Sequence, residues 1–483
     1  MDEERFDVVI IGAGLAGIGM ACHLAREHPG KRVALIERRQ RLGGTWDLFR
    51  FPGIRSDSDV FSFGYAFRPW QSPTTMADGE SIRQYIQDAA REYGVEEKIH
   101  YGLQVQRAEW SGADGAWTLH AVHEATGRQQ VFTARFLVSC TGYYDYDAGY
   151  QPSFPGQEHF GGTIVHPQHW PSDLNYTGKN VVVIGSGATA VTLVPAMAEK
   201  AAHVTLLQRS PSYIISLPGV DPISKLLGHI LPKAVVHRMA RRIMIAIQRG
   251  LYLACRRWPH AMRRLLVAQM RLYAGKGMDM RHFTPSYMPW DERVCVVPDA
   301  DLFKVIKAGK ASMATDRIDT FTPTGIRLAS GQELPADIVV SATGLTIQVL
   351  GGMQVRVDGV PQPLHDRMLY KAVLVQDLPN FACVIGYANA PWTLKADLAA
   401  AYVCRLLTHM DTSGAAVATP RDLDGVAAEG NVLGQLTAGY VKRGDAVMPR
   451  QGRTYPWAVE HHYGRDRRML VAAPIPDRWL ELR

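Results

Sequence analysis

The chain has 483 residues, 47% of them hydrophobic, with a formal net charge of +7, and this length favours two or three domains with buried cores. Its six cysteines include no C-x-x-C pair, which argues against a disulfide framework, a dithiol redox centre and a zinc site. Reduced thiols in the cytoplasm are expected. Residues 8–25 lack charged side chains but follow Asp2-Glu3-Glu4, so neither an export signal nor a transmembrane span is expected.

The N-terminal region carries the pattern of a dinucleotide fold. Residues 7–11 form an apolar run of strand length, a G-A-G-L-A-G loop follows, and a helical stretch extends to about residue 27. The next strand, 31–37, ends in an acid at the position where a carboxylate accepts hydrogen bonds from a ribose diol. In a strand–loop–helix–strand order, these residues predict a pyrophosphate site at a helix N-terminus. The residues assigned to this first nucleotide are Gly12, Gly14, Gly17 and Glu37.

Further along the chain, strand-like pieces at 99–107, 116–123 and 129–138 end in Ser-Cys-Thr-Gly. Residues 337–344 repeat this ending with Thr343-Gly344. Both resemble the turns at which flavoproteins with two dinucleotides bring strands back beneath a cofactor.

A second nucleotide loop begins 173 positions after the first. It follows the apolar run 181–184 and leads into a helix that extends to about residue 200. The next strand, 203–208, ends in Arg209-Ser210 where the first copy has Glu37. A cation there favours a 2′-phosphate and therefore NADPH over NADH; the alternative is a surface arginine without a ligand. The residues assigned to this nucleotide are Gly185, Gly187, Ala188, Thr189, Arg209 and Ser210.

The segment between the loops carries a family pattern. Residues 160–171 match F-x-G-x-x-x-H-x-x-x-W-P, and residues 43–57 match G-G-x-W-x(4)-F/Y-P-G-x(3)-D. On both motifs the chain resembles type I Baeyer–Villiger monooxygenases, which are class B flavoproteins. The fingerprint residues are Phe160, Gly162, His166, Trp170 and Pro171.

The resemblance implies that the flavin site includes Gly44 and Thr45, and that Trp46 and Asp57 lie close to the isoalloxazine. Without it, core packing for Trp46 and a helix N-cap for Asp57 would be the preferred interpretations. It also implies that His166 is a hinge and hydrogen-bonding residue and not a proton-transfer base.

The resemblance is greatest to the ethionamide-activating subgroup, through residues 283–295 and 389–397. It implies that Arg293, held by Asp57, is the catalytic cation, that Asn389 and Trp392 belong to the flavin site, and that Glu292 replaces a lysine of the cyclic-ketone branch. The alternative for Arg293 is a surface salt bridge to Asp291 or Glu292.

These assignments predict an α/β fold with two Rossmann-like domains. The FAD domain is expected at 1–145 and 335–483, the fingerprint linker at 146–177, and the NADPH domain at 178–334 with a basic helical insertion at 218–282. The expected reaction converts ketones to esters or lactones with NADPH and O2 through a C4a-peroxyflavin, with sulfoxidation of thioethers as a further activity. An N- or S-oxidising flavin monooxygenase and a non-catalytic nucleotide-binding or membrane-docked sensor are the alternatives.

Charge is unevenly distributed along the chain. Residues 222–278 contain 12 Lys and Arg and no Asp or Glu, which leaves a net charge of about −5 for the rest. Residues 238–249 have the pattern of a basic amphipathic helix, so peripheral contact with an anionic membrane is one interpretation. The other is an insertion whose arginines face water and whose apolar side packs internally. No nucleic-acid motif accompanies the charge, and no nucleic-acid partner is expected.

Overall fold

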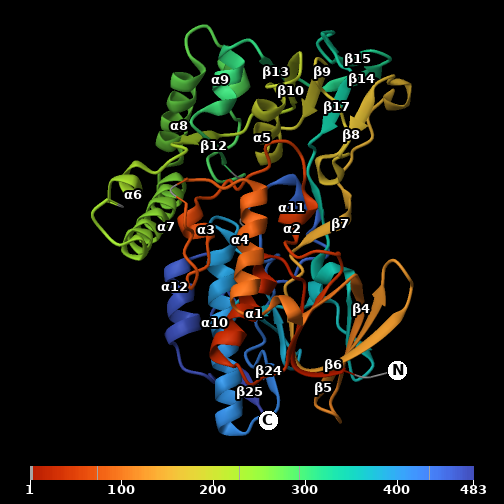
Figure 1. The fold of residues 1–483 in the computed structure, drawn as a ribbon, viewed down its shortest axis with the longest axis vertical. Coiled ribbons are helices and arrows are strands. Elements are labelled where there is room, and N and C mark those ends of the chain that lie inside the picture. The colour runs from red at the N-terminus through yellow and green to blue at the C-terminus, as the bar shows by residue number, and fades with distance from the viewer. Residues whose placement is uncertain (1–3, 73, 228, 293, 435) are drawn as a thin grey trace.

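The structure is a computed structural model that describes residues 4–72, 74–227, 229–292, 294–434 and 436–483. Two α/β bodies lie one above the other along the long axis, each built around its own sheet (Figure 1). The predicted fold class, two Rossmann-like units with a helical insertion, is confirmed.

The lower body in Figure 1 contains the first nucleotide loop. Its sheet has the order β20-β19-β4-β5-β6-β1-β2-β3, and β23 continues it beside β6. The strands are β1 Glu4–Ile11, β2 Val33–Glu37, β3 Ile99–Tyr101, β4 Leu103–Ser111, β5 Ala116–His123, β6 Gln129–Ser139, β19 Gln354–Val357, β20 Val360–Pro361, β21 Leu369–Tyr370, β22 Leu374–Val375 and β23 Phe381–Cys383.

Helices cover one face of this sheet. Residues 8–11 of β1 are buried on both sides, as expected for a central parallel strand, and β1 pairs in parallel with β2 and β6. The predicted strand 99–107 is divided at Gly102, whose φ of +75° suits glycine.

The helices of this body are α1 Leu15–Glu27, α2 Thr45–Leu48, α3 Val60–Phe63, α4 Gly79–Glu92, α10 Trp392–Ser413, α11 Gly439–Arg443 and α12 Tyr463–Arg467. Near the C-terminus, β24 Ala418–Pro420 pairs with β25 Leu480–Leu482.

The upper body contains the second nucleotide loop in a parallel sheet of order β13-β10-β9-β17-β8. Its strands are β8 Thr163–Val165, β9 Asn180–Ile184, β10 His203–Gln208, β13 Ala311–Thr315 and β17 Ile338–Ser341. Around them lie β11 Ile214–Leu217, β12 Cys295–Pro298, β14 Ile318–Thr322, β15 Gly325–Leu328, β16 Glu333–Pro335, α5 Ala188–Met197 and α9 Asp301–Lys307.

The sheet content corrects the predicted domain limits at two places. β17 lies beyond residue 334 but pairs with β9, Ile338 opposite Val181, so it belongs to the upper body. β8 lies in the predicted linker but pairs with β17, Ile338 opposite Thr163. Parallel pairing to a central strand, which sequence spacing does not reveal, assigns both segments to this sheet. The chain crosses between the bodies through β7 Tyr144–Gly149 and β18 Leu345–Ile347, which pair antiparallel.

The basic insertion is helical, as predicted, with α6 Pro222–Leu227, α7 Lys233–Arg257 and α8 Pro259–Ala274. α6 and α7 project at one side of the molecule, between the levels of the two sheets (Figure 1). No helix in the described part of the chain is both long and apolar enough to cross a membrane.

A buried charge cluster joins α1, α10 and α7. His23 contacts Asp397 (Nε2 to Oδ1, 3.6 Å) and Glu27 (Nδ1 to Oε1, 3.2 Å), and Arg241 lies 3.6 Å from the other Asp397 oxygen. Burial alone would lower the pKa of His23, but its contacts with Asp397 and Glu27 outweigh burial and raise the pKa to about 9.

The raised pKa predicts a pH-dependent contribution to stability. Because the ordinary value is 6.5, the contribution of His23 is complete below pH 6.5 and is lost as the pH rises toward 9. Its full size is about 3 kcal/mol. Urea unfolding at pH 6.5 and 9.5 should therefore show a larger loss of stability for the wild type than for His23→Gln. Equal losses in the two proteins would contradict this role.

Candidate active site

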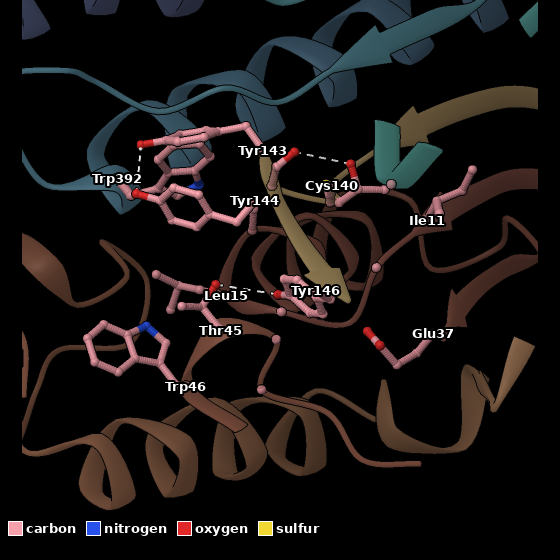
Figure 2. Close-up of a pocket in the computed structure, with 18 of the residues that line it drawn as sticks. Ile11, Leu15, Glu37, Thr45, Trp46, Cys140, Tyr143, Tyr144, Tyr146 and Trp392 are labelled. Carbon is pink, nitrogen blue, oxygen red and sulfur yellow. Dashed lines mark hydrogen bonds between the residues drawn. The ribbon is translucent and has the colours of Figure 1, made fainter. Parts of the chain in front are cut away.

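A cavity of about 300 Å³ opens at the end of β1 and β2 in the lower body. Segments far apart in the sequence line it: residues 11–16, 36–38, 43–46, 140–146 and 390–392. In Figure 2, Glu37 lies at one side, Trp46 at the other, and Tyr146 between them. The cavity is therefore elongated from the end of β2 toward the aromatic side chains.

Two glycines of the first loop, Gly12 and Gly17, have no room for a side chain. A Cβ on Gly17 would lie 1.8 Å from the Gly12 carbonyl oxygen, and one on Gly12, whose φ is +99°, would lie 2.7 Å from the carbonyl oxygen of Cys140. Gly14 precedes α1 as its N-cap and faces the cavity. The backbone of this loop can therefore approach a phosphate at the helix N-terminus, as a dinucleotide requires.

Glu37 ends β2 and is 4% exposed. Its Oε2 accepts a hydrogen bond from the Ala13 backbone N–H at 2.7 Å, and its Oε1 accepts one from the Arg39 N–H at 2.8 Å. Burial raises the pKa of Glu37, and these two N–H groups oppose that rise. The carboxylate is thus held in one orientation at the cavity edge, where a ribose hydroxyl can donate to its remaining lone pairs.

Residues 43–46 lie beside the first glycine loop and also line the cavity. Gly44 has φ +57°, and a Cβ there would lie 2.9 Å from the Cα of Gly14, so the two glycines let the segments meet. Thr45 Oγ1 lies 3.4 Å from the hydroxyl of Tyr146. Trp46 is half-buried and packs edge-on against Phe63 at 5.8 Å between ring centroids, with its indole lining the cavity. The motif residues therefore face the space that the first loop opens.

Asp57 does not cap helix α3. The N-cap of α3 is Asp59, whose side chain accepts from the backbone N–H of Ser62 at 2.8 Å. Asp57 is half-buried and lines the cavity. The capping alternative for Asp57 is therefore wrong, because its neighbour two positions later caps the helix.

The start of α10 closes the cavity from the C-terminal half. Ala390, Pro391 and Trp392 line it, so the positive end of this helix faces the cavity. Trp392 packs against Tyr143 at 5.1 Å between ring centroids. Asn389 lies just before this turn and donates from Nδ2 to the His461 carbonyl at 3.2 Å, so it anchors the turn.

The second nucleotide loop lies between β9 and α5. Gly185 has φ +141°, and a Cβ there would lie 2.4 Å from the carbonyl oxygen of Ala342. A Cβ on Gly187 would meet no heavy atom within 4 Å, and both Gly187 and Ala188 are exposed, with Thr189 half-buried beside them. Backbone geometry thus requires glycine at Gly185, whereas the protein itself leaves Gly187 open for a ligand.

Cations gather near the end of β10. Arg209 is exposed and Ser210 half-buried directly after this strand. Burial raises the pKa of Glu292, while the nearby cations Lys442 of α11 and Arg209 lower it. Sequence reasoning did not find Lys442, because nothing near it in the chain relates it to the second nucleotide loop.

The fingerprint histidine is enclosed where the chain crosses between the bodies. The N–H of Gln168 donates to His166 Nδ1 at 3.2 Å, and His166 Nε2 lies 3.2 Å from the carbonyl oxygen of Gly344. A neutral ring with the proton on Nε2 satisfies both contacts. Burial lowers the pKa of His166, which keeps it neutral. Next to Gly344, Thr343 Oγ1 donates to the Tyr150 carbonyl at 2.7 Å.

The other fingerprint residues pack locally. Phe160 contacts Phe321 edge-on at 5.8 Å between ring centroids. A Cβ on Gly162 would lie 2.3 Å from the Asp337 carbonyl oxygen, so this position requires glycine to reach the strand β8. Trp170 and Pro171 are half-buried, and Trp170 packs against the core of the upper body. The fingerprint residues thus connect the segment that crosses between the two bodies to the sheet of the upper body.

Arg293, the predicted catalytic cation, lies outside the described residues. The residues before it are tied to distant segments: Asp291 Oδ1 pairs with Arg256 Nη1 at 2.9 Å, and the Asp291 carbonyl accepts from the Thr437 backbone N–H at 2.9 Å. After it, Val294 is buried directly before β12.

Comparison with known proteins places this geometry in a family. Residues 64–387 match the flavin-binding monooxygenase-like family, and residues 10–78 match an NAD(P)-binding Rossmann-like domain. A Mycobacterium tuberculosis protein named FAD-containing monooxygenase MymA is 60% identical over 478 residues, covering 98% of this chain and 97% of its own. The FAD-containing monooxygenase EthA of M. tuberculosis is 46% identical over 479 residues, covering 99% and 97%. The structure of oxidized steroid monooxygenase bound to NADP has a TM-score of 0.78 at 21% identity, with 99% of both chains covered.

The chain belongs to the flavin-binding monooxygenase family. The predicted resemblance and the predicted enzyme class, a flavin-dependent monooxygenase, are confirmed. The likeness to the steroid monooxygenase structure supports the two-body fold.

Two further features of this monooxygenase were not found from the sequence. The first is the run Tyr143, Tyr144 and Tyr146, which lines the cavity. Its place directly after the Thr141-Gly142 turn is the signal that could have revealed it.

The second is a contact between α7 and the wall of the cavity. Arg241 Nη1 donates to the carbonyl oxygens of Phe61 at 2.8 Å and Gly64 at 2.6 Å, and Gln248 Nε2 donates to Asp59 Oδ2 at 2.6 Å. These contacts hold α3, and with it Phe63 on the cavity wall, against the insertion. They join residues about 180 positions apart, which no local pattern reveals.

Proposed function

We propose that this flavin-binding monooxygenase is a Baeyer–Villiger enzyme that converts ketones to esters or lactones with FAD, NADPH and O2. One observation carries the proposal: each of the two sequence motifs lies at a functional position of the fold. Trp46 and Asp57 of the first motif line the cavity, and His166 of the second lies where the chain crosses between the two bodies. The names of the relatives, which are FAD-containing monooxygenases, and the NADP-bound steroid monooxygenase support it.

FAD fits the first cavity. The glycine loop accommodates a pyrophosphate, Glu37 accepts from a ribose, and Trp46 and the start of α10 lie where a flavin ring would end. NADPH fits the loop at Gly187, with Arg209 toward the 2′-phosphate. When bound, NADPH supplies the hydride and FAD supplies the ring at which O2 is activated.

The role of the protein in this reaction is to stabilise negative charge and to exclude water. Attack of an activated oxygen on a ketone carbon develops negative charge, which a fixed cation next to the flavin stabilises. We assign this cation to Arg293 and its positioning to Asp57, which lines the cavity and does not cap α3. Trp46, Tyr143 and Trp392 cover the cavity with aromatic surface and limit the entry of water.

An N- or S-oxidising activity is the second candidate, because membership of the flavin-binding monooxygenase family does not distinguish the two reaction types. Heteroatom oxidation needs no carbonyl attack and therefore no cation to stabilise an adduct. We expect this chain to sulfoxidise thioethers in addition to its reaction with ketones.

The test is the product formed from each substrate class. Purified enzyme with NADPH and O2 is given linear, cyclic and aryl ketones and, separately, thioethers, and products are identified by gas chromatography and mass spectrometry. We expect esters or lactones from ketones and sulfoxides from thioethers. Sulfoxides without any ester would favour the second candidate and overturn the first.

A further inference from the structure

The insertion helix α7 has two faces of opposite character. Its inner face, with Val236, Ala240 and Arg241, is buried against the lower body. Its outer face presents large apolar side chains to solvent: Val235 is 37% exposed, Met239 41%, Ile243 40% and Ile247 57%. The prediction that the apolar side of this insertion packs internally therefore accounts for only one face of the helix.

The exposed side chains form a continuous row. Residues 235, 239, 243 and 247 are spaced by four, so they lie one above the other along the helix. Trp258, 60% exposed, follows at the end of α7. We call residues 235, 239, 243, 247 and 258 the apolar stripe. Single exposed apolar residues are normal in proteins, but a row of this length marks an interaction surface.

Positive charge flanks the apolar stripe. Arg238 and Arg242 are exposed next to it, and among the described residues neither has an acidic partner within salt-bridge distance. Residues 222–278 contain no Asp or Glu at all, while the rest of the chain is net negative. An apolar stripe bordered by cations is complementary to a surface that is apolar inside and anionic at its rim.

A second copy of the chain fits this surface poorly. A symmetric dimer would place the same face against itself, so that the arginines around one apolar stripe would meet those around the other. Such like-charge contacts without acids in the segment are unfavourable. A phospholipid surface with anionic headgroups satisfies both the apolar row and the flanking arginines.

We propose that α7 docks on an anionic phospholipid surface, with the apolar stripe in the acyl–headgroup boundary and Arg238 and Arg242 at lipid phosphates. Trp258 at the helix end suits the interface, where amphipathic indole rings are favoured. This is a peripheral contact, because no described helix is apolar enough to cross the bilayer. The proposal does not depend on the reaction that the enzyme catalyses.

Docking would also bring the flavin cavity close to lipid. The inner face of α7 holds α3 through Arg241, and Phe63 of α3 lines the cavity. The cavity is therefore one short helix away from the proposed lipid contact.

The test is sedimentation of the FAD-loaded enzyme with vesicles. Vesicles of phosphatidylcholine with 30% phosphatidylglycerol are compared with pure phosphatidylcholine vesicles, each in 0.1 M and 0.5 M NaCl. We expect binding to the anionic vesicles that falls at high salt. The double variants Ile243→Glu/Ile247→Glu and Arg238→Glu/Arg242→Glu should each weaken it by about tenfold or more.

Matched controls carry the same chemical changes elsewhere. Val360→Glu/Leu423→Glu removes exposed apolar side chains of similar exposure, and Lys310→Glu/Arg317→Glu reverses exposed cations of the upper body. The controls should bind vesicles as the wild type does, and all variants should keep their FAD content and NADPH oxidation.

Three results would overturn the proposal. They are an absence of vesicle binding by the wild type, equal binding to neutral and anionic vesicles, and equal effects of the control and the α7 variants. Light scattering distinguishes the competing occupant: a dimer that the Ile243→Glu/Ile247→Glu variant converts to a monomer, without vesicle binding, would assign the apolar stripe to a second copy.

Discussion

Replacing Arg293 with alanine is expected to abolish ester formation while NADPH still reduces the flavin. Removing a single preorganised charge-stabilising group from an active site lowers the rate on the order of 100- to 1000-fold. Hydride transfer precedes the oxygen chemistry and does not require this cation. Stopped-flow reduction under anaerobic conditions and product analysis in air separate the two steps. Arg293→Lys, which keeps the charge without the bidentate geometry, should retain part of the oxygenation.

The control for this experiment is Arg256→Ala. Arg256 pairs with Asp291 in the loop that leads to Arg293, and it is exposed. If loss of ester formation came from a disturbed loop, this variant would show it as well. Normal ester formation by Arg293→Ala would remove Arg293 from the mechanism, and an equal loss in Arg256→Ala would assign the effect to the loop.

The second large effect is expected at the second nucleotide loop, which we propose binds NADPH, and two substitutions there test contacts with two different parts of the coenzyme. Gly187→Ala meets no protein atom within 4 Å, so the fold should tolerate it. The added methyl group occupies the space through which the backbone approaches the pyrophosphate. We expect the KM for NADPH and for NADH to rise together by at least about tenfold, a change of ~1.4 kcal/mol.

Arg209→Ala should act on NADPH alone. A charge-assisted contact to the 2′-phosphate contributes about 1.5–3 kcal/mol, so its loss should raise the KM for NADPH by roughly tenfold or more and leave that for NADH unchanged. Steady-state kinetics with both coenzymes, at unchanged FAD content, give the comparison. An equal change for both coenzymes in Arg209→Ala, or no change in Gly187→Ala, would contradict the assigned site.

The nucleotide folds could be predicted because their signals are local. Glu37 follows Gly17 by a fixed interval, because Gly17 lies in the first turn of α1 and Glu37 ends β2, the next element along the chain. The same holds for Gly185 and β10. Each copy has a glycine that a close backbone contact requires, Gly17 against Gly12 in the first and Gly185 against Ala342 in the second.

Features that depend on distant segments could not be predicted. The run Ser56–Asp59 offers several cap residues, and the choice of Asp59 depends on where α3 begins and on Gln248 of α7. The assignment of β17 to the upper sheet depends on its pairing with β9, and Lys442 reaches the region of Glu292 only through the fold. The outer face of α7 is similar: its periodicity is visible in the sequence, but its exposure is not.

The most direct test of the proposed reaction is the fate of molecular oxygen. The enzyme is incubated with NADPH, a linear methyl ketone and ¹⁸O2, and the ester is analysed by mass spectrometry before and after hydrolysis. We expect an ester with one labelled oxygen, and the label in the alcohol after hydrolysis, because that atom is inserted between the carbonyl carbon and the alkyl carbon. Consumption of NADPH with hydrogen peroxide as the product and no labelled ester would contradict it.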